Sequence, residues 1–159
     1  MSEEIMYKTE ELVDNLQPEE TTDTQKFLIF MIDDLKLGVY AEYVVEILTN
    51  QPITYLPMLP DFVRGIINMR GQMIPILDIR LRLGKPFQED GLVIVLNVEG
   101  MQLGLMVDGV DQMTDIPTSS ILPVPAQSSV HLLVSGMCSL PDGFGTMMVL
   151  DCAQLLPHD

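Results

Sequence analysis

The chain has 159 residues, of which 47% are hydrophobic, and only eight of them are Lys or Arg, so the net charge is −15. This length suits one domain, or two small subdomains that share a core. The acidic charge argues against a nucleic-acid partner, which needs a basic face, and against binding to anionic membrane surfaces. The apolar runs fall far short of the roughly 20 residues of a membrane span, and no signal peptide opens the chain.

Residues 1–25 have the composition of a tail. They hold eight acidic residues and one lysine, which gives a net charge of −7. Four apolar residues fit one face of a short helix, namely Ile5, Leu12, Val13 and Leu16. So few apolar side chains cannot offset the entropy lost on ordering, and the sequence therefore predicts a flexible acidic tail.

From residue 26 onward the pattern becomes that of a β protein. Short apolar runs bounded by turn residues predict strands over residues 27–32, 35–40, 63–69 and 72–77. Asp33-Asp34 forms the first turn, and Gly71 forms the second. Residues 42–48 are expected to form one or two helical turns. The prolines at positions 52, 57 and 60 make the following segment extended.

An internal repeat relates the two halves of the chain. A shift of about 66 residues places residues 27–47 over residues 93–113 without a gap and aligns Leu37-Gly38 with Leu103-Gly104. After an insertion of about seven residues, Ile76-Leu77-Asp78 aligns with Val149-Leu150-Asp151. In each half the aspartate is expected to open a short helix as its N-cap.

The repeat predicts a mainly all-β fold of two small five-stranded barrels packed side by side, with short helices. Closing each sheet removes its exposed edges, and pairing the barrels supplies a shared core that one unit of this size lacks. The approximate subdomains are residues 26–85 and 92–150, followed by a short C-terminal helix over residues 151–156.

The sequence offers little chemistry. Cys138, Cys152, His131 and His158 are dispersed, and neither metal-ligand spacing nor a nucleophile motif is present. Glycines occur singly at turns, so there is no phosphate-binding loop. We expect two buried thiols in a reducing cytoplasm, with no catalytic residue, no metal site and no cofactor. A small enzyme that uses Cys138 or His131 is the alternative.

A cluster of cations stands out in this acidic chain. Five of the eight lie within 22 residues, namely Arg64, Arg70, Arg80, Arg82 and Lys85. Arg70 at the hairpin turn and Glu46 at the end of the expected helical turn can form a bidentate ion pair. Two interpretations stay open. The pair is an ordinary surface contact worth about 0–1 kcal/mol, or it fixes Arg70 beside Val44, Ile66 and Met69 as an anchor for another protein.

At these residues the chain resembles the CheW family of bacterial chemotaxis adaptors. The resemblance runs from about Lys26 to Leu156 and departs from the family pattern at Ser135-Gly136-Met137-Cys138, which replaces a more usual apolar-glycine run. It rests on several motifs in order, namely Phe27-Leu28-Ile29-Phe30, Leu37-Gly38-Val39, Val44-Val45-Glu46-Ile47, residues 60–71, Ile74-Pro75-Ile76-Leu77-Asp78, Val107-Asp108-Gly109-Val110 and Val149-Leu150-Asp151.

The resemblance implies two Src-homology-3-like five-stranded barrels and a non-catalytic adaptor that couples methyl-accepting chemoreceptors to the histidine kinase CheA. It implies binding to the regulatory domain of the kinase, and to the cytoplasmic tip of the receptor in the groove between the barrels. This location is cytoplasmic, at receptor arrays on the inner face of the membrane, without membrane insertion. A CheW-like scaffold of another receptor–kinase pathway is the alternative.

The resemblance also bears on the candidate site. The characteristic Glu–Arg pair of the family falls on Glu46 and Arg70, and the positions beside the receptor-binding groove match Val44, Asn68 and Gly71. With Ile66, these residues form the expected partner-binding site. The resemblance favours the anchor interpretation of Arg70.

Overall fold

The computed structural model describes residues 23–49, 51–60, 62–86, 91–124, 133–140 and 143–155. Most of the predicted acidic tail, His131, His158 and the end of the predicted C-terminal helix lie outside these residues. Thr24 and Gln25, which the sequence assigned to the tail, already belong to the first strand. Within the described residues, no helix is long and apolar enough to cross a membrane.

Short strands make up most of the described chain. In chain order they are β1 (Thr24–Ile32), β2 (Leu35–Tyr40), β3 (Val44–Thr49), β4 (Val63–Met69), β5 (Gln72–Leu77), β6 (Leu92–Val98), β7 (Met101–Val107), β8 (Gly109–Pro117), β9 (Leu122–Pro123), β10 (Val134–Ser139) and β11 (Thr146–Leu150). The connecting 3-10 helices are η1 (Ala41–Tyr43), η2 (Leu81–Leu83), η3 (Thr118–Ser120) and η5 (Cys152–Leu155). The four strands predicted in the first half correspond to β1, β2, β4 and β5.

The helical turns predicted over residues 42–48 are wrong in their larger part. Only η1 is helical, and Val44 opens strand β3. Val44, Val45, Ile47 and Thr49 are β-branched, which restricts their side chains in a helix and suits a pleated strand. Backbone pairing with β6 completes the strand. Glu46 therefore lies on a strand and not at the end of a helix.

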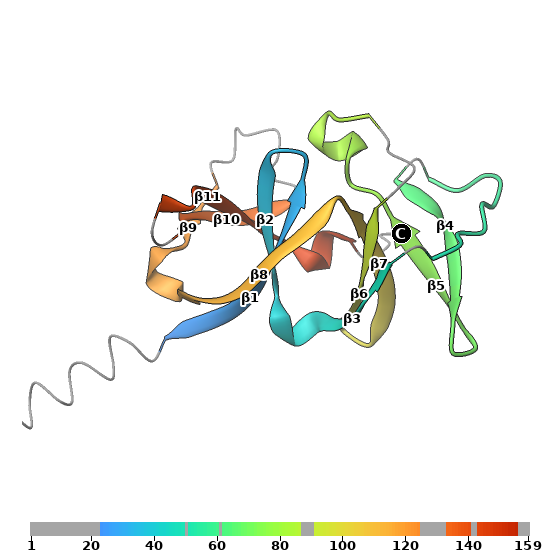
Figure 1. Ribbon diagram of the computed structural model, residues 1–159, viewed down its shortest axis with the longest axis horizontal. Helices are drawn as coiled ribbons and strands as arrows, with labels where there is room; N and C mark the ends of the chain where they lie inside the picture. The colour runs from blue at the N-terminus through green and yellow to red at the C-terminus, as the bar shows by residue number, and fades with distance from the viewer. Residues whose placement is uncertain are drawn as a thin grey trace, which may run out of the picture.

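The strands form two sheets that lie side by side, as Figure 1 shows. Barrel A has the strand order β8-β1-β2-β11-β10-β9, and barrel B has the order β3-β6-β7-β5-β4. Each contains one parallel contact, β11 with β2 in barrel A and β5 with β7 in barrel B. An isolated bridge between Thr54 and Ile66 extends barrel B as β9 extends barrel A.

The two barrels have the same strand order under the predicted repeat, but the halves exchange their first hairpins. Hairpin β1–β2 completes the sheet whose other strands, β8, β9, β10 and β11, come from the second half. Hairpin β6–β7 completes the sheet whose other strands, β3, β4 and β5, come from the first half. Residues 26–85 and 92–150 therefore each supply strands to both barrels.

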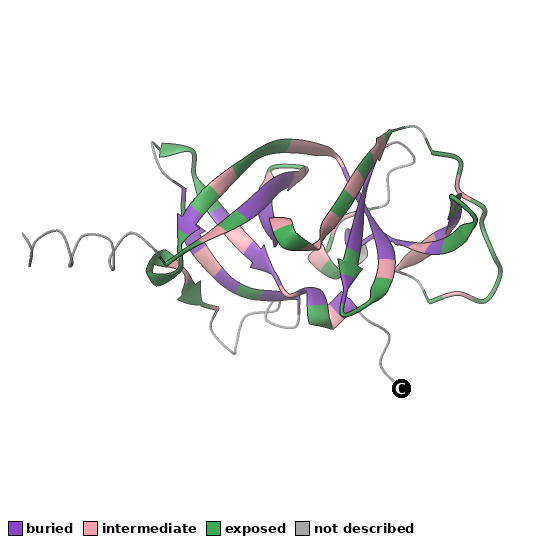
Figure 2. Ribbon diagram, turned by 90° about the horizontal axis from the view of Figure 1, so that it is seen from below, coloured by how far each residue is buried: buried purple, intermediate pink, exposed green. Residues whose placement is uncertain are grey.

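The exchanged hairpins are buried on both faces. Phe27 and Ile29 of β1 face the interior of barrel A, whereas Leu28 and Phe30 belong to a core that strands of both barrels share. Strand β6 behaves in the same way in barrel B. In Figure 2, buried stretches, drawn in purple, run through the strands of both sheets. This double burial explains why the sequences of the exchanged hairpins are continuous apolar runs rather than alternating ones.

Candidate functional site

The β4–β5 turn presents Arg70. Arg70 and Gly71 both have left-handed backbone conformations, with φ values of 53° and 82°. A two-residue turn with this geometry matches the twist of the strands that it joins, and glycine adopts it without a steric penalty. The Gly71 N–H donates to Oδ1 of Asn68 at 3.1 Å. Asn68 and Gly71 therefore shape the turn from which the Arg70 side chain projects.

Arg70 and Glu46 form the ion pair that the sequence predicts. Nη2 of Arg70 lies 3.2 Å from Oε2 of Glu46, and the two side chains are 74% and 34% exposed. Strand β3 and the β4–β5 hairpin stand at opposite ends of the sheet order, so the pair links the two ends of barrel B across its closure. An exposed pair of this kind contributes about 0–1 kcal/mol to stability. It holds Arg70 in place more than it stabilises the fold.

Val44 and Ile66, two further residues of the predicted site, lie on strands β3 and β4. Val44 stands two residues before Glu46 on β3 and is half-buried against the shared core. Ile66 is held on β4, where its backbone exchanges hydrogen bonds of 2.8 and 2.9 Å with Thr54. Val45 and Ile47, which the sequence did not single out, are exposed on either side of Glu46 along β3.

An open cleft of about 580 Å³ lies at the end of barrel B. It forms because β5 and β7 pair only at Ile76–Gly104 and Leu77–Leu105 and diverge beyond that point. Its lining residues are Gln72, Met73, Ile74, Pro75, Asn97, Gly100, Met101 and Gln102. Sequence reasoning missed this cleft because its walls are far apart in the chain.

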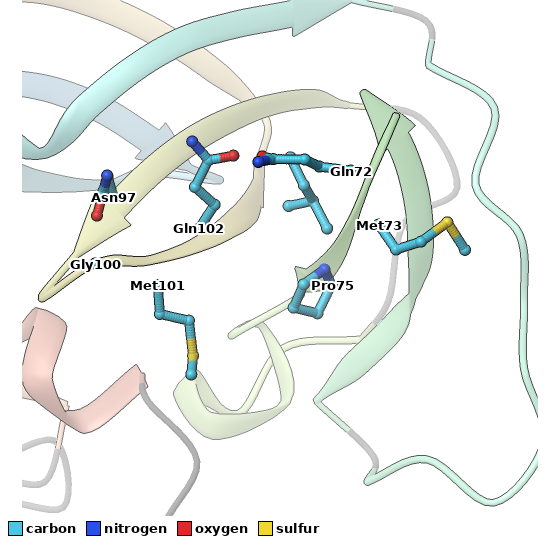
Figure 3. Close-up of a pocket in the computed structure, with 8 residues that line it drawn as sticks. Gln72, Met73, Pro75, Asn97, Gly100, Met101 and Gln102 are labelled. Carbon is cyan, nitrogen blue, oxygen red and sulfur yellow. The ribbon is translucent and has the colours of Figure 1, made fainter. Parts of the chain in front are cut away.

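The cleft combines thioether and amide groups. Met73 and Met101 are 63% and 44% exposed. In Figure 3 the amide groups of Asn97, Gln102 and Gln72 lie along one side, and Met101 and Pro75 lie along the other. The buried Oε1 atom of Gln102 accepts no hydrogen bond from any described residue. The cleft can thus bind an apolar group and still offer hydrogen bonds to a backbone.

The corresponding end of barrel A carries a lysine with contacts of its own. Lys36, the repeat counterpart of Gln102, donates from Nζ to the carbonyl oxygen of Phe144 at 2.8 Å and lies 5.6 Å from the centre of its ring. Asp111 of β8 lies 3.8 Å from the same ammonium group. The β10–β11 loop that carries Phe144 is longer than the β4–β5 turn. The two barrel ends therefore differ, although their strands are equivalent.

A second charged cluster, centred on Arg80, was also missed. Arg80 is only 3% exposed, and its Nη1 donates to both carboxylate oxygens of Asp108 at 2.7 and 2.8 Å. Nη2 donates to Asp33 at 2.7 Å, and Nε donates to the Pro86 carbonyl at 2.8 Å. Lys85 lies 3.3 Å from Asp33. The sequence feature that could have revealed this cluster is an arginine between two apolar residues, because a guanidinium that becomes buried requires partners for its charge.

Asp78 closes a turn in front of η2. Its Oδ1 accepts a hydrogen bond of 3.0 Å from the N–H of Arg80, which precedes the helix, so the bond does not cap an N–H of η2 itself. Asp151, its repeat counterpart, donates from its backbone to Leu133, and its carbonyl accepts from Gln154.

The two cysteines are buried thiols. Cys138 is 4% and Cys152 is 5% exposed, and burial raises the pKa of both. For Cys152 the pKa rises to about 12, so almost none of it is thiolate at neutral pH. Among the described residues, no group of three or more His, Cys, Asp or Glu side chains is arranged to hold a metal ion.

Comparisons with known proteins match the chain over both barrels. The model of the CheW-like domain matches residues 26–159. Chemotaxis protein CheW of Klebsiella aerogenes is 35% identical over 140 residues, which cover 85% of this chain and 83% of that protein. Protein FrzA of Myxococcus xanthus is 36% identical over 115 residues, with 69% and 72% covered. The crystal structure of the scaffolding protein TtCheW from Thermoanaerobacter tengcongensis covers 80% of this chain and 88% of its own, with 28% identity and a TM-score of 0.73.

Proposed function

The chain belongs to the CheW-like family, and on that basis we propose that it is a chemotaxis adaptor that couples methyl-accepting chemoreceptors to the histidine kinase CheA. The observation that supports this role most is the Arg70 turn, in which Asn68 accepts a hydrogen bond from the turn backbone and Glu46 pairs with the exposed arginine. The adaptor works by binding alone, without a catalytic step, at receptor arrays on the inner face of the membrane.

The receptor is proposed to bind at the Arg70 site, which comprises Val44, Glu46, Ile66, Asn68, Arg70 and Gly71. A receptor helix offers apolar side chains at positions i, i+3, i+4 and i+7, which suit a half-buried apolar strand such as β3. The flat guanidinium of Arg70 can stack on that helix and donate hydrogen bonds at the same time. The contribution of Glu46 is to hold the guanidinium ready for both contacts.

The regulatory domain of the kinase is proposed to bind at the open end of barrel B. Met73 and Met101 are exposed there, and methionine adapts its shape to an apolar partner. The amide groups of Gln72, Asn97 and Gln102 can bind the backbone of an inserted loop. The two proposed sites adjoin at the β4–β5 hairpin, where Asn68 of the receptor site pairs with Met73 of the kinase site.

The receptor site is tested with Arg70→Ala, with Arg82→Ala as the control because Arg82 is also an exposed arginine of the same segment. We expect Arg70→Ala to weaken binding to a receptor cytoplasmic fragment about tenfold while the fold is retained. Kinase activation in a reconstituted array should fall in parallel. Unchanged affinity and unchanged kinase activation in a folded Arg70→Ala variant would show that the assignment is wrong.

The kinase site is tested with Met101→Glu, matched by Met113→Glu on β8, where the methionine is similarly exposed at 52%. We expect only Met101→Glu to weaken binding to the kinase regulatory domain, because a carboxylate placed in the cleft must give up its hydration. Calorimetric titration measures both variants. Equal losses for the two variants would locate the kinase elsewhere.

A further inference from the structure

Arg80 joins three segments at a point where the chain passes between the barrels. Asp33 lies in the turn of hairpin β1–β2 in barrel A, and Arg80 follows β5 of barrel B. Asp108 is the residue between β7 of barrel B and β8 of barrel A. The upper edge of Figure 1 shows the β1–β2 turn and the η2 segment meeting there. One side chain therefore ties both barrels to the crossover that connects them.

The polar network at this crossover is directional where the apolar core is not. Apolar contacts between the barrels depend on buried area and tolerate small shifts. Arg80 instead donates four hydrogen bonds to fixed acceptors, and the N–H of Asp33 donates to Asp108. Rotation of one barrel on the other would break several of these bonds while most of the apolar burial persisted.

The second crossover lacks this network. The chain passes from β2 of barrel A to β3 of barrel B through η1. Under the repeat, Glu42 and Glu99 correspond to Asp108 and Asp33, but the counterpart of Arg80 is Ala153. After burial, both glutamates are among the charged groups that raise the pKa of Tyr43 in η1. The second crossover therefore has counterparts of the two acidic residues but no counterpart of the Arg80 guanidinium.

We infer that Arg80 is a positioning residue that fixes the angle between the two barrels and thereby holds the Arg70 site in its binding geometry. The Arg70 site begins at Val44, directly after η1, on the crossover that has no arginine of its own. Its placement relative to barrel A is set by the shared core, against which Val44 packs, and by the directional Arg80 network at the other crossover. This inference rests on the proposed receptor site for its effect on binding, but its structural part stands independently.

The test compares Arg80→Met and Asp33→Gly with Glu99→Gly. Asp33 and Glu99 occupy equivalent hairpin turns with φ values of 54° and 53°, and glycine accepts both. Spin labels on exposed Asp115 of β8 and Thr49 of β3 report the distance between the barrels. A second pair, Asp115 and Ser139 of β10, reports on barrel A alone. Alanine replaces both native cysteines, and double electron–electron resonance measures the distances.

We expect Arg80→Met and Asp33→Gly to broaden the distance distribution between the barrels and to leave the distribution within barrel A unchanged. Affinity for the receptor fragment should fall about 2- to 30-fold in the same variants. Glu99→Gly should change neither quantity. If Arg80→Met does not fold, Asp33→Gly decides alone, since the Asp33 carboxylate is 36% exposed and Asp108 still pairs with the buried guanidinium.

An unchanged inter-barrel distribution in the folded variants would overturn the inference, and so would equal broadening within barrel A, which indicates general loosening. A changed inter-barrel distance with unchanged receptor affinity would overturn the positioning role. Absence of receptor binding by the unmodified protein would contradict the proposed function instead, and the distance measurement would still decide whether Arg80 fixes the barrels.

Discussion

Two of the carboxyl groups that accept hydrogen bonds from Arg80, those of Asp33 and Asp78, respond to pH in opposite directions. The hydrogen bond from Arg80 lowers the pKa of Asp33 below its ordinary value of 3.8. The ionised Asp33 carboxylate therefore contributes its full stabilisation well above pH 3.8, and this stabilisation is lost as the pH falls through the lowered pKa. Burial raises the pKa of Asp78, so that this group costs stability as the pH rises from 3.8 through its raised pKa.

Asp33→Gly is expected to reduce the free energy of unfolding clearly at pH 7 and less at pH 3. The physical reason is that the stabilisation from the Asp33 carboxylate declines once the pH falls below 3.8 and towards the lowered pKa. Urea denaturation at both pH values measures the effect, and Glu99→Gly corrects for the added glycine. A loss of stability that is as large at pH 3 as at pH 7 would show that another feature of Asp33 is responsible.

Cys152 is expected to resist alkylation in the folded protein. With a pKa of about 12, its thiolate is scarce at pH 8, and burial blocks the reagent. Mass spectrometry after iodoacetamide treatment should show modification only when urea is added. Rapid modification without urea would show that Cys152 is not a buried, protonated thiol in the folded protein.

Single residues differed in how far the sequence alone predicted them. Arg70 could be found because a charge at a glycine-containing turn has a local signature, and Glu46 was proposed as its partner before the family motif added support. Arg80 could not be assigned a role, because its partners Asp33 and Asp108 come from segments 47 and 28 residues away. A local pattern carries no information on such partners.

Among the elements, the close approach of β4 to the segment before it depends on one glycine. A Cβ atom at Gly65 would collide with the backbone oxygen of Thr54, which pairs with Ile66, and would lie 2.8 Å from Ile53. At Gly38 the colliding atom is the sulfur of Met147, which has other rotamers available.

Gly65→Ala is therefore expected to lower the free energy of unfolding by about 2–3 kcal/mol, and Gly38→Ala by about 1 kcal/mol. The backbone of Thr54 can move only by breaking its bridge to β4, whereas the Met147 side chain can rotate. Urea denaturation with fluorescence of an introduced tryptophan, or with circular dichroism, compares the two. A larger loss for Gly38→Ala would contradict this ranking.

The hairpins were predictable at the element scale, and the contacts between them were not. Strands β4 and β5 match the predicted ranges because turn residues and apolar runs are adjacent in sequence. Strand β3 was mistaken for helical turns because six residues with mixed spacing fit either period. The parallel contacts of β2 with β11 and of β5 with β7 join distant segments that no local pattern links.

For the whole molecule, the exchange of hairpins predicts that neither half folds alone. A chain divided between residues 88 and 89 leaves β1 and β2 in one fragment and β8 to β11, their partners in barrel A, in the other. We expect each fragment to be unfolded by circular dichroism and an equimolar mixture to regain the native spectrum. A dispersed NMR spectrum from either fragment by itself would contradict this prediction.

The overall architecture was predicted because the repeat in the sequence survives as the common strand order of the two barrels. What the repeat could not reveal is which half supplies each hairpin, since both arrangements give the same local pattern. The physical clue lies in residues 27–30, which are apolar on both faces and so require burial on both sides.

The exchanged hairpins also set the order of events on the ribosome. Barrel B has all its strands once Val107 has emerged, but β2 waits for its parallel partner until Thr146–Leu150 is made, close to the end of synthesis. Hairpin β1–β2, apolar on both faces, is thus among the first segments translated and among the last to be fully covered. During that interval the nascent chain exposes a surface that chaperones recognise, so that expression yield should respond to chaperone supply more than the stability of the finished fold suggests.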